Sequence, residues 1–117
     1  MTLKVKTTAA GSRNVSVQIS GILGTADHCH GVFPLVKLEH TDIKLMSFLF
    51  LIQEKAGLLL WWDEAQENLI LPLESRGAFK LEVGIKSPEG WDGQIWAEAF
   101  KVDDDVKGFL LLMDFDR

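Results

Sequence analysis

Apolar and polar residues alternate along much of this 117-residue chain. In the segment AFKLEVGIK, for example, Phe79, Leu81 and Val83 fall on one side, with charged residues between them. The same period of two recurs at residues 3–8, 14–20 and 109–115. Because successive side chains of an extended strand point to opposite faces, this pattern is typical of strands with one buried face. The alternation therefore predicts an all-β fold.

Short turn signals separate the candidate strands. Glycine, proline, asparagine and aspartate gather in AAGSRN, SPEGWDG and DDDVKG, and these residue types favour turns. The predicted strands lie near residues 3–8, 14–20, 33–40, 43–52, 58–62, 69–74, 78–86, 94–102 and 109–115. About eight to nine short strands at this spacing are typical of an antiparallel β-sandwich or barrel. The length fits a single β-rich domain over residues 1–117.

The segment TDIKLMSFLFLIQEKAG admits two predictions. A helix near residues 42–56, with threonine as N-cap and glycine at its end, would give an α+β fold with that helix packed on an antiparallel sheet. A hairpin would instead place a strand near 43–52, a turn at EKAG and a returning strand near 58–62. The run Leu45–Ile52 is apolar on every side except Ser47, and such a helix would need burial all round. We therefore favour the hairpin, with its first strand covered on both faces.

The stretch LFLIQEKAGLLLWW also bears on assembly. Two strands that are apolar on both sides need cover, and an exposed apolar strip is an interaction site or an aggregation hazard. In a chain of this length, we expect another subunit to supply the second covering layer. The chain is therefore expected to form a homo-oligomer through an apolar sheet face. The alternative is a sandwich that buries both strands within one monomer.

The formal net charge is −5 at pH 7, which argues against nucleic acid and membranes as partners. Residues 1–20 hold three basic and no acidic residues, so the remainder carries −8. We interpret this difference as solvated strand faces of opposite sign; the alternative is a weakly basic edge that docks on an acidic partner or on the protein's own acidic half. The chain shows neither a signal peptide nor an apolar run of membrane-spanning length, and its one cysteine excludes an internal disulfide. The expected location is the cytoplasm.

Two histidines, His28 and His30, stand in the stretch GTADHCHG, and His40 follows ten residues later. Imidazole is a common metal ligand, so the three side chains are candidates for a divalent-metal site with an open position. The H-x-H pattern resembles the first motif of the cupins, and that resemblance implies a β-barrel enzyme that depends on a metal. The chain departs from the motif, because no glutamate follows at the expected spacing and no histidine follows His40. We interpret the glycine-bounded stretch as a loop between strands and expect no cofactor.

The chain has four tryptophans and no tyrosine. Trp62, Trp91 and Trp96 are candidates for a ligand-binding platform, because an indole ring stacks on apolar ligand faces and offers an N–H donor. Glu98 joins this group because it lies between two aromatic residues on one strand face. The alternative for the tryptophans is packing in the core and at interfaces, and for Glu98 it is a solvent-exposed position.

The common enzyme motifs are absent. The chain has no P-loop, no glycine-rich dinucleotide motif, no H-E-x-x-H and no G-x-S-x-G, and no catalytic residue is assigned. We therefore expect a small, acidic, non-enzymatic binding or assembly module that self-associates and binds a protein partner or a small ligand. The alternatives are a cupin-like metal-dependent enzyme that uses the three histidines and a small-molecule or sugar binder that uses exposed tryptophans.

Overall fold

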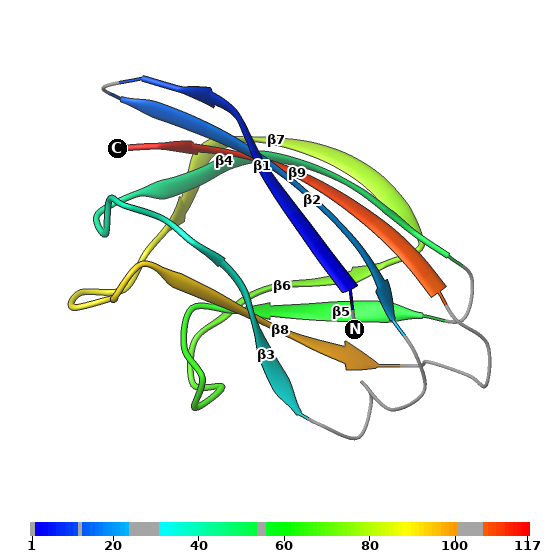
Figure 1. The fold of residues 1–117 in the computed structure, drawn as a ribbon. Coiled ribbons are helices and arrows are strands. Elements are labelled where there is room, and N and C mark those ends of the chain that lie inside the picture. The colour runs from blue at the N-terminus through cyan, green and yellow to red at the C-terminus, as the bar shows by residue number, and fades with distance from the viewer. Residues whose placement is uncertain (1, 12, 24–30, 54–55, 101–106) are drawn as a thin grey trace.

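The computed structural model describes residues 2–11, 13–23, 31–53, 56–100 and 107–117. The described chain is built of strands and contains no helix, and the strands form two packed layers (Figure 1). The strands are β1 (Thr2–Ala10), β2 (Asn14–Leu23), β3 (Val32–Lys37), β4 (Lys44–Ile52), β5 (Gly57–Trp61), β6 (Leu69–Glu74), β7 (Arg76–Lys86), β8 (Gln94–Phe100) and β9 (Lys107–Asp116). Each predicted strand overlaps one of these, and the predicted antiparallel β-sandwich is confirmed.

The strands pair into a larger sheet, in the order β1-β2-β9-β4-β7, and a smaller sheet, in the order β3-β8-β5-β6. All neighbouring strands are antiparallel. Only β1–β2 and β5–β6 are consecutive strands that pair with each other, so the chain passes between the sheets at its six other connections. These repeated crossings tie the two layers together along the whole chain.

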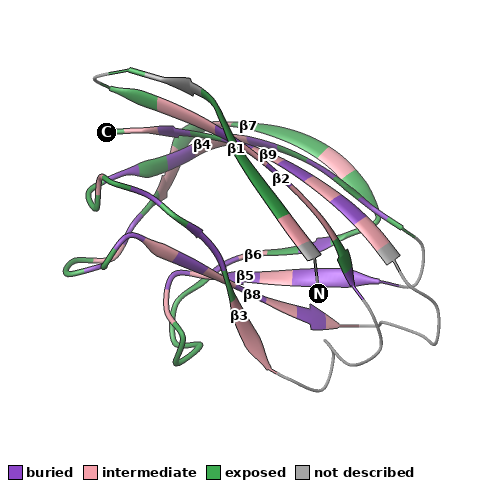
Figure 2. Ribbon diagram, in the orientation of Figure 1, coloured by how far each residue is buried: buried purple, intermediate pink, exposed green. Residues whose placement is uncertain are grey.

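The core lies between the inner faces of the two sheets, as the purple segments of Figure 2 show. In the larger sheet, Leu111 of β9 sits opposite Ile19 of β2 on one side and Phe50 of β4 on the other. All three side chains are buried, and Leu58 and Ile95 of the smaller sheet belong to the same core. The alternation seen in the sequence thus sorts most strands into a buried inner face and an outer face. Edge strand β7 is the exception, because Phe79 and Val83 of its apolar side are 54% and 80% exposed.

The predicted hairpin between the fourth and fifth strands is wrong. Both segments are strands, so the helix over 42–56 is also excluded, but β4 belongs to the larger sheet and β5 to the smaller one. Nor is β4 covered on both faces: its inner residues, such as Phe50 and Ile52, are buried, while Leu49 and Leu51 on its outer face are 36% and 46% exposed. The apolar outer face, which suggested a covered central strand, is open in the monomer.

The difference between inner and outer leucines gives a direct stability test. Leu58 is fully buried, whereas Leu51 is 46% exposed. We expect Leu58→Ala to lower the free energy of unfolding of the monomer by about 2–5 kcal/mol, because it removes core contacts and leaves a cavity. The matched change Leu51→Ala should cost about 0.5 kcal/mol or less. Urea unfolding of dilute protein measures both values, and equal losses would contradict the assignment of inner and outer faces.

Candidate interaction surfaces

The outer face of the larger sheet carries an apolar patch, which we call the leucine face. It consists of Ile22 on β2, Leu49 and Leu51 on β4, and Leu110 and Leu112 on β9. Leu49 lies opposite Leu112 and Leu51 lies opposite Leu110, so the four leucines form two adjacent cross-strand pairs. Because Ile22, Leu49 and Leu51 are each at least one-third exposed, the patch presents large apolar side chains to solvent.

Basic side chains border the leucine face at both edges of the sheet. On edge strand β1, Lys4 and Lys6 lie opposite outward-facing residues of β2. On edge strand β7, Arg76 lies opposite Leu51, and Lys80 lies two outward positions further along, opposite Ser47. All four basic residues are exposed. The four gaps between five neighbouring strands place the two basic edges about 19 Å apart.

One carboxylate, that of Asp114, interrupts this basic border at the centre of the sheet. Ser16 donates a hydrogen bond to its Oδ1 at 2.5 Å, and Ser47 donates one to its Oδ2 at 2.6 Å. The serines come from β2 and β4, the two strands that flank β9. The carboxylate is therefore held by hydroxyl groups along the sheet surface, next to the leucine pairs.

The outer face of the smaller sheet carries a second apolar surface, which we call the tryptophan face. Trp61 on β5 lies opposite Trp96 on β8, and the row continues to Pro34 on β3 and Leu69 on β6. Leu59 extends it in the next outward row of β5. Both indole rings are half-buried. Within the described part of the chain, the Trp61 Nε1–H has no hydrogen-bond acceptor, so no polar contact fixes this ring.

The four candidate ligand-binding residues fall into two places. Trp62 and Trp91 are buried, 3% and 7% exposed, and their rings pack edge to face at a centroid distance of 4.8 Å. The Trp91 Nε1–H donates to the Gln94 backbone oxygen at 2.9 Å, which uses the donor that a ligand would need. Trp96 and Glu98 instead share the outer face of β8, half-buried. Trp61 and Trp62 are adjacent on a strand and must face opposite ways, and we chose Trp62 as the outward candidate. The structure buries Trp62 and places Trp61 on the outer face.

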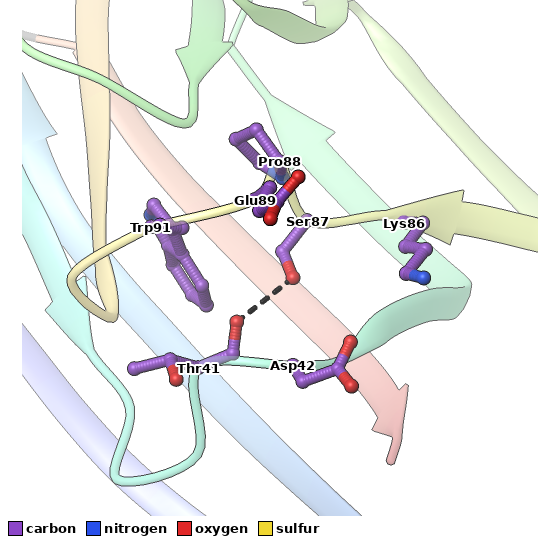
Figure 3. Close-up of a pocket in the computed structure, with 8 residues that line it drawn as sticks. Thr41, Asp42, Lys86, Ser87, Pro88, Glu89 and Trp91 are labelled. Carbon is purple, nitrogen blue, oxygen red and sulfur yellow. Dashed lines mark hydrogen bonds between the residues drawn. The ribbon is translucent and has the colours of Figure 1, made fainter.

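A hollow of about 440 Å³ lies beside Trp91, between the loop before β4 and the loop after β7 (Figure 3). Its charged lining residues are Asp42, Lys86 and Glu89, and all three are exposed. A binding or catalytic site usually holds a few polar groups that are partly desolvated and converge on one point. This hollow lacks that arrangement, so we assign it no ligand.

Ser87, in the same hollow, is a structural residue. It is a buried polar residue, 6% exposed, and its hydroxyl donates to the Thr41 backbone oxygen at 2.9 Å, the contact drawn in Figure 3. The Ser87 Oγ also accepts a hydrogen bond from the Ile43 backbone N–H at 3.2 Å. The hydroxyl thus ties the two loops together and satisfies backbone groups that the sheets leave unpaired.

His40 is half-buried in a shallow hollow that Lys37 and Glu39 also line. Among the described residues, no group of three histidine, cysteine, aspartate or glutamate side chains is arranged to hold a metal ion. His28 and His30 lie outside the described residues, so the three-histidine site and the cupin-like enzyme stay predictions. In the described ranges, His40 is therefore part of no group of metal-ligating side chains that would support either prediction.

The chain is similar to a known protein in its fold and to none in its sequence. No protein-family model matches the chain, and no curated protein matches it. Among solved structures, a chain of the acidic stable capsid of Helicobacter pylori bacteriophage KHP30 is similar, with a TM-score of 0.52 and 14% sequence identity. The similarity covers 97% of this chain and 93% of that chain, so it extends over the whole sandwich, and at this identity it shows the fold alone. Within the described ranges, no helix is long and apolar enough to cross a membrane.

The role of Ser87 can be tested by removing one oxygen atom. Ser87→Ala leaves the buried Ile43 N–H without the hydroxyl acceptor and the Thr41 carbonyl without its donor. We expect the free energy of unfolding to fall by about 1–3 kcal/mol, the cost of leaving a buried polar group unsatisfied. The exposed Ser75, at the junction of β6 and β7, provides a serine-to-alanine control in the same urea titration, with a smaller expected loss. An unchanged midpoint for Ser87→Ala would contradict the structural role.

Proposed function

We propose that the protein is a structural subunit of a larger protein assembly of the capsid kind, and that copies of it associate through the tryptophan face. The observation that carries this proposal is that both outer faces of the sandwich are apolar at their centres. A monomer needs only its inner faces to be apolar, and extended apolar surfaces on a soluble domain mark interaction sites. A building block in contact with neighbours on both sides needs this arrangement.

The charges of the two faces favour the tryptophan face for contacts between copies. Its outward charged residues are Lys37, Glu74 and Glu98, which sum to −1. Two copies related by a two-fold axis present the same patch to each other, so a nearly neutral patch brings little like charge together. The Trp61–Trp96 pair lies at the centre of that patch, and tryptophan is among the residue types most enriched where binding energy concentrates.

The similarity to the capsid chain supports a role as an assembly subunit. It does not bear on which face of the sandwich joins the copies. That protein belongs to a capsid, and its chain has the same sandwich over nearly its whole length. The lack of common enzyme motifs in this sequence also fits a structural role. Fold similarity alone does not carry function, so the proposal depends on the surfaces described above.

Two leucines on opposite faces give a matched test of self-association. Leu59 lies beside the tryptophan pair and Leu51 lies on the leucine face. We expect Leu59→Gln to weaken association of copies by about 100-fold, because a two-fold contact loses about 1.5 kcal/mol at each of two equivalent sites. Leu51→Gln should leave association unchanged. Sedimentation velocity over a wide range of protein concentration measures both.

Two results would overturn this proposal. One is a wild-type protein that stays a single-chain species at all concentrations. The other is an oligomer that Leu51→Gln dissociates and Leu59→Gln does not, since that would assign the contact to the leucine face. Far-UV circular dichroism confirms that each variant is folded, and Trp96→Gln is a second variant of the tryptophan face should Leu59→Gln fail to fold.

A further inference from the structure

We infer that the leucine face docks on a different protein, and that the docking surface of this partner is apolar at its centre and acidic at two borders about 19 Å apart. This inference concerns the face opposite to the one that joins copies, so it stands independently of the self-association. It is carried by the pattern of charge around the leucines, by the size of the face and by the geometry of the sandwich.

The leucine face is a basic surface on an acidic protein. Lys4, Lys6, Arg76 and Lys80 against Asp114 give the face +3. The whole chain carries −5, so all other residues together carry −8. The next positions along the sheet add Lys44 and Lys86 against Glu82 and Asp116, which sum to zero and leave the face at +3. Positive charge that is gathered on one face of a negative protein selects and steers a negative partner.

The arrangement of these charges matches a protein interface. The leucine pairs lie on the central strand β9 and on β4 beside it, and the basic residues lie on the two edge strands, β1 and β7 (Figure 1). On the β1 side, the polar Gln18 and Ser20 of β2 stand between the leucines and the lysines. An apolar centre inside a polar rim is the usual anatomy of a protein contact. Five strands about 4.8 Å apart and eight residues long present about 600 Å², close to the roughly 800 Å² that one partner contributes to a standard interface.

A second copy of this chain does not fit the leucine face. A two-fold contact would set +3 against +3, and juxtaposed like charges oppose association. The acidic remainder of another copy offers opposite charge, but the two outer faces lie on opposite sides of the sandwich (Figure 1). The far side of the next copy is the tryptophan face, which carries only −1 and so offers few carboxylates to the two basic borders. The occupant is a different protein.

Nucleic acid and anionic membranes fit the face less well than a protein does. Grooves for single-stranded nucleic acid combine basic residues with aromatic side chains on which bases stack, whereas the centre of this face is leucine. The hydroxyl-bound carboxylate of Asp114 lies between the two basic edges, where a phosphate backbone or a lipid headgroup layer would meet it. An acidic protein surface with its own apolar centre places its carboxylates at the edges instead.

Binding to synthetic polymers tests the partner chemistry without the natural partner. The main probe is a fluorescent random copolymer of glutamate and leucine, and the comparison probes are polyglutamate, a short DNA duplex and phosphatidylglycerol vesicles. We expect the copolymer to bind more tightly than the other three, with an affinity that falls as salt rises. Fluorescence anisotropy measures the soluble probes and co-sedimentation measures the vesicles.

Variants at each edge connect that binding to the leucine face. Lys6→Glu on β1 and Arg76→Glu on β7 should each weaken copolymer binding by about fivefold. Lys37→Glu reverses an equally exposed charge on the smaller sheet and should change little. Leu51→Gln should weaken binding by about tenfold, whereas Leu59→Gln should leave it intact while dissociating the copies.

The inference is overturned if the copolymer does not bind, or if Lys37→Glu weakens binding as much as Lys6→Glu and Arg76→Glu do. Tighter binding of DNA or vesicles than of the copolymer would also overturn it and would assign the face to that class of partner. Loss of self-association in Lys6→Glu would overturn it in favour of a second copy. If the protein is monomeric and Leu51→Gln still weakens copolymer binding, the proposed self-association is wrong and the inference about the leucine face stands.

Discussion

The two sheets share one interior, and each strand turns only one of its two faces towards it. Pairing of β9 with both β2 and β4 sets this division for the larger sheet, because it places Leu111 between Ile19 and Phe50. Every second residue of these strands is thereby assigned to the core, and the residues between them to the surface. A slip of one residue would exchange the two sets, so the burial of the inner row also fixes which leucines remain outside.

That division explains how one small domain has two different outer surfaces. The inner faces supply most of the hydrophobic stabilisation of the fold. Leu49 and Leu51 stay exposed on one outer face, and Trp61 and Trp96 stay half-buried on the other. Around the outer leucines the edge strands add lysine and arginine, whereas the surface around Trp61 and Trp96 is close to neutral. Two surfaces with different charge patterns are suited to different neighbours, which is the property that a subunit of a mixed assembly requires.

Alternation along the chain was enough to predict nearly all the strands, because side-chain period is a local property of each segment. Strand partners are not local. Ser16 and Asp114, which share a hydrogen bond, stand 98 positions apart, and no local pattern connects them. The predicted hairpin was wrong for the same reason: apolar residues on both sides of β4 look alike in sequence whether the outer side is covered or open. Only the exposure of Leu49 and Leu51 in the folded chain separates these two cases, and only the placement of β5 in the other sheet excludes the hairpin.

The charge pattern of the leucine face also depends on strand partners that the sequence does not reveal. The sequence shows an excess of positive charge in its first twenty residues, which we interpreted as solvated strand faces of no special meaning. Edge strand β7, about seventy positions later, brings Arg76 and Lys80 to the opposite side of the same leucines. The basic edge predicted as an alternative is therefore one half of a two-sided border. Because β1 and β7 hold the two ends of one sheet, the leucines that they enclose form a bounded surface rather than scattered exposed residues.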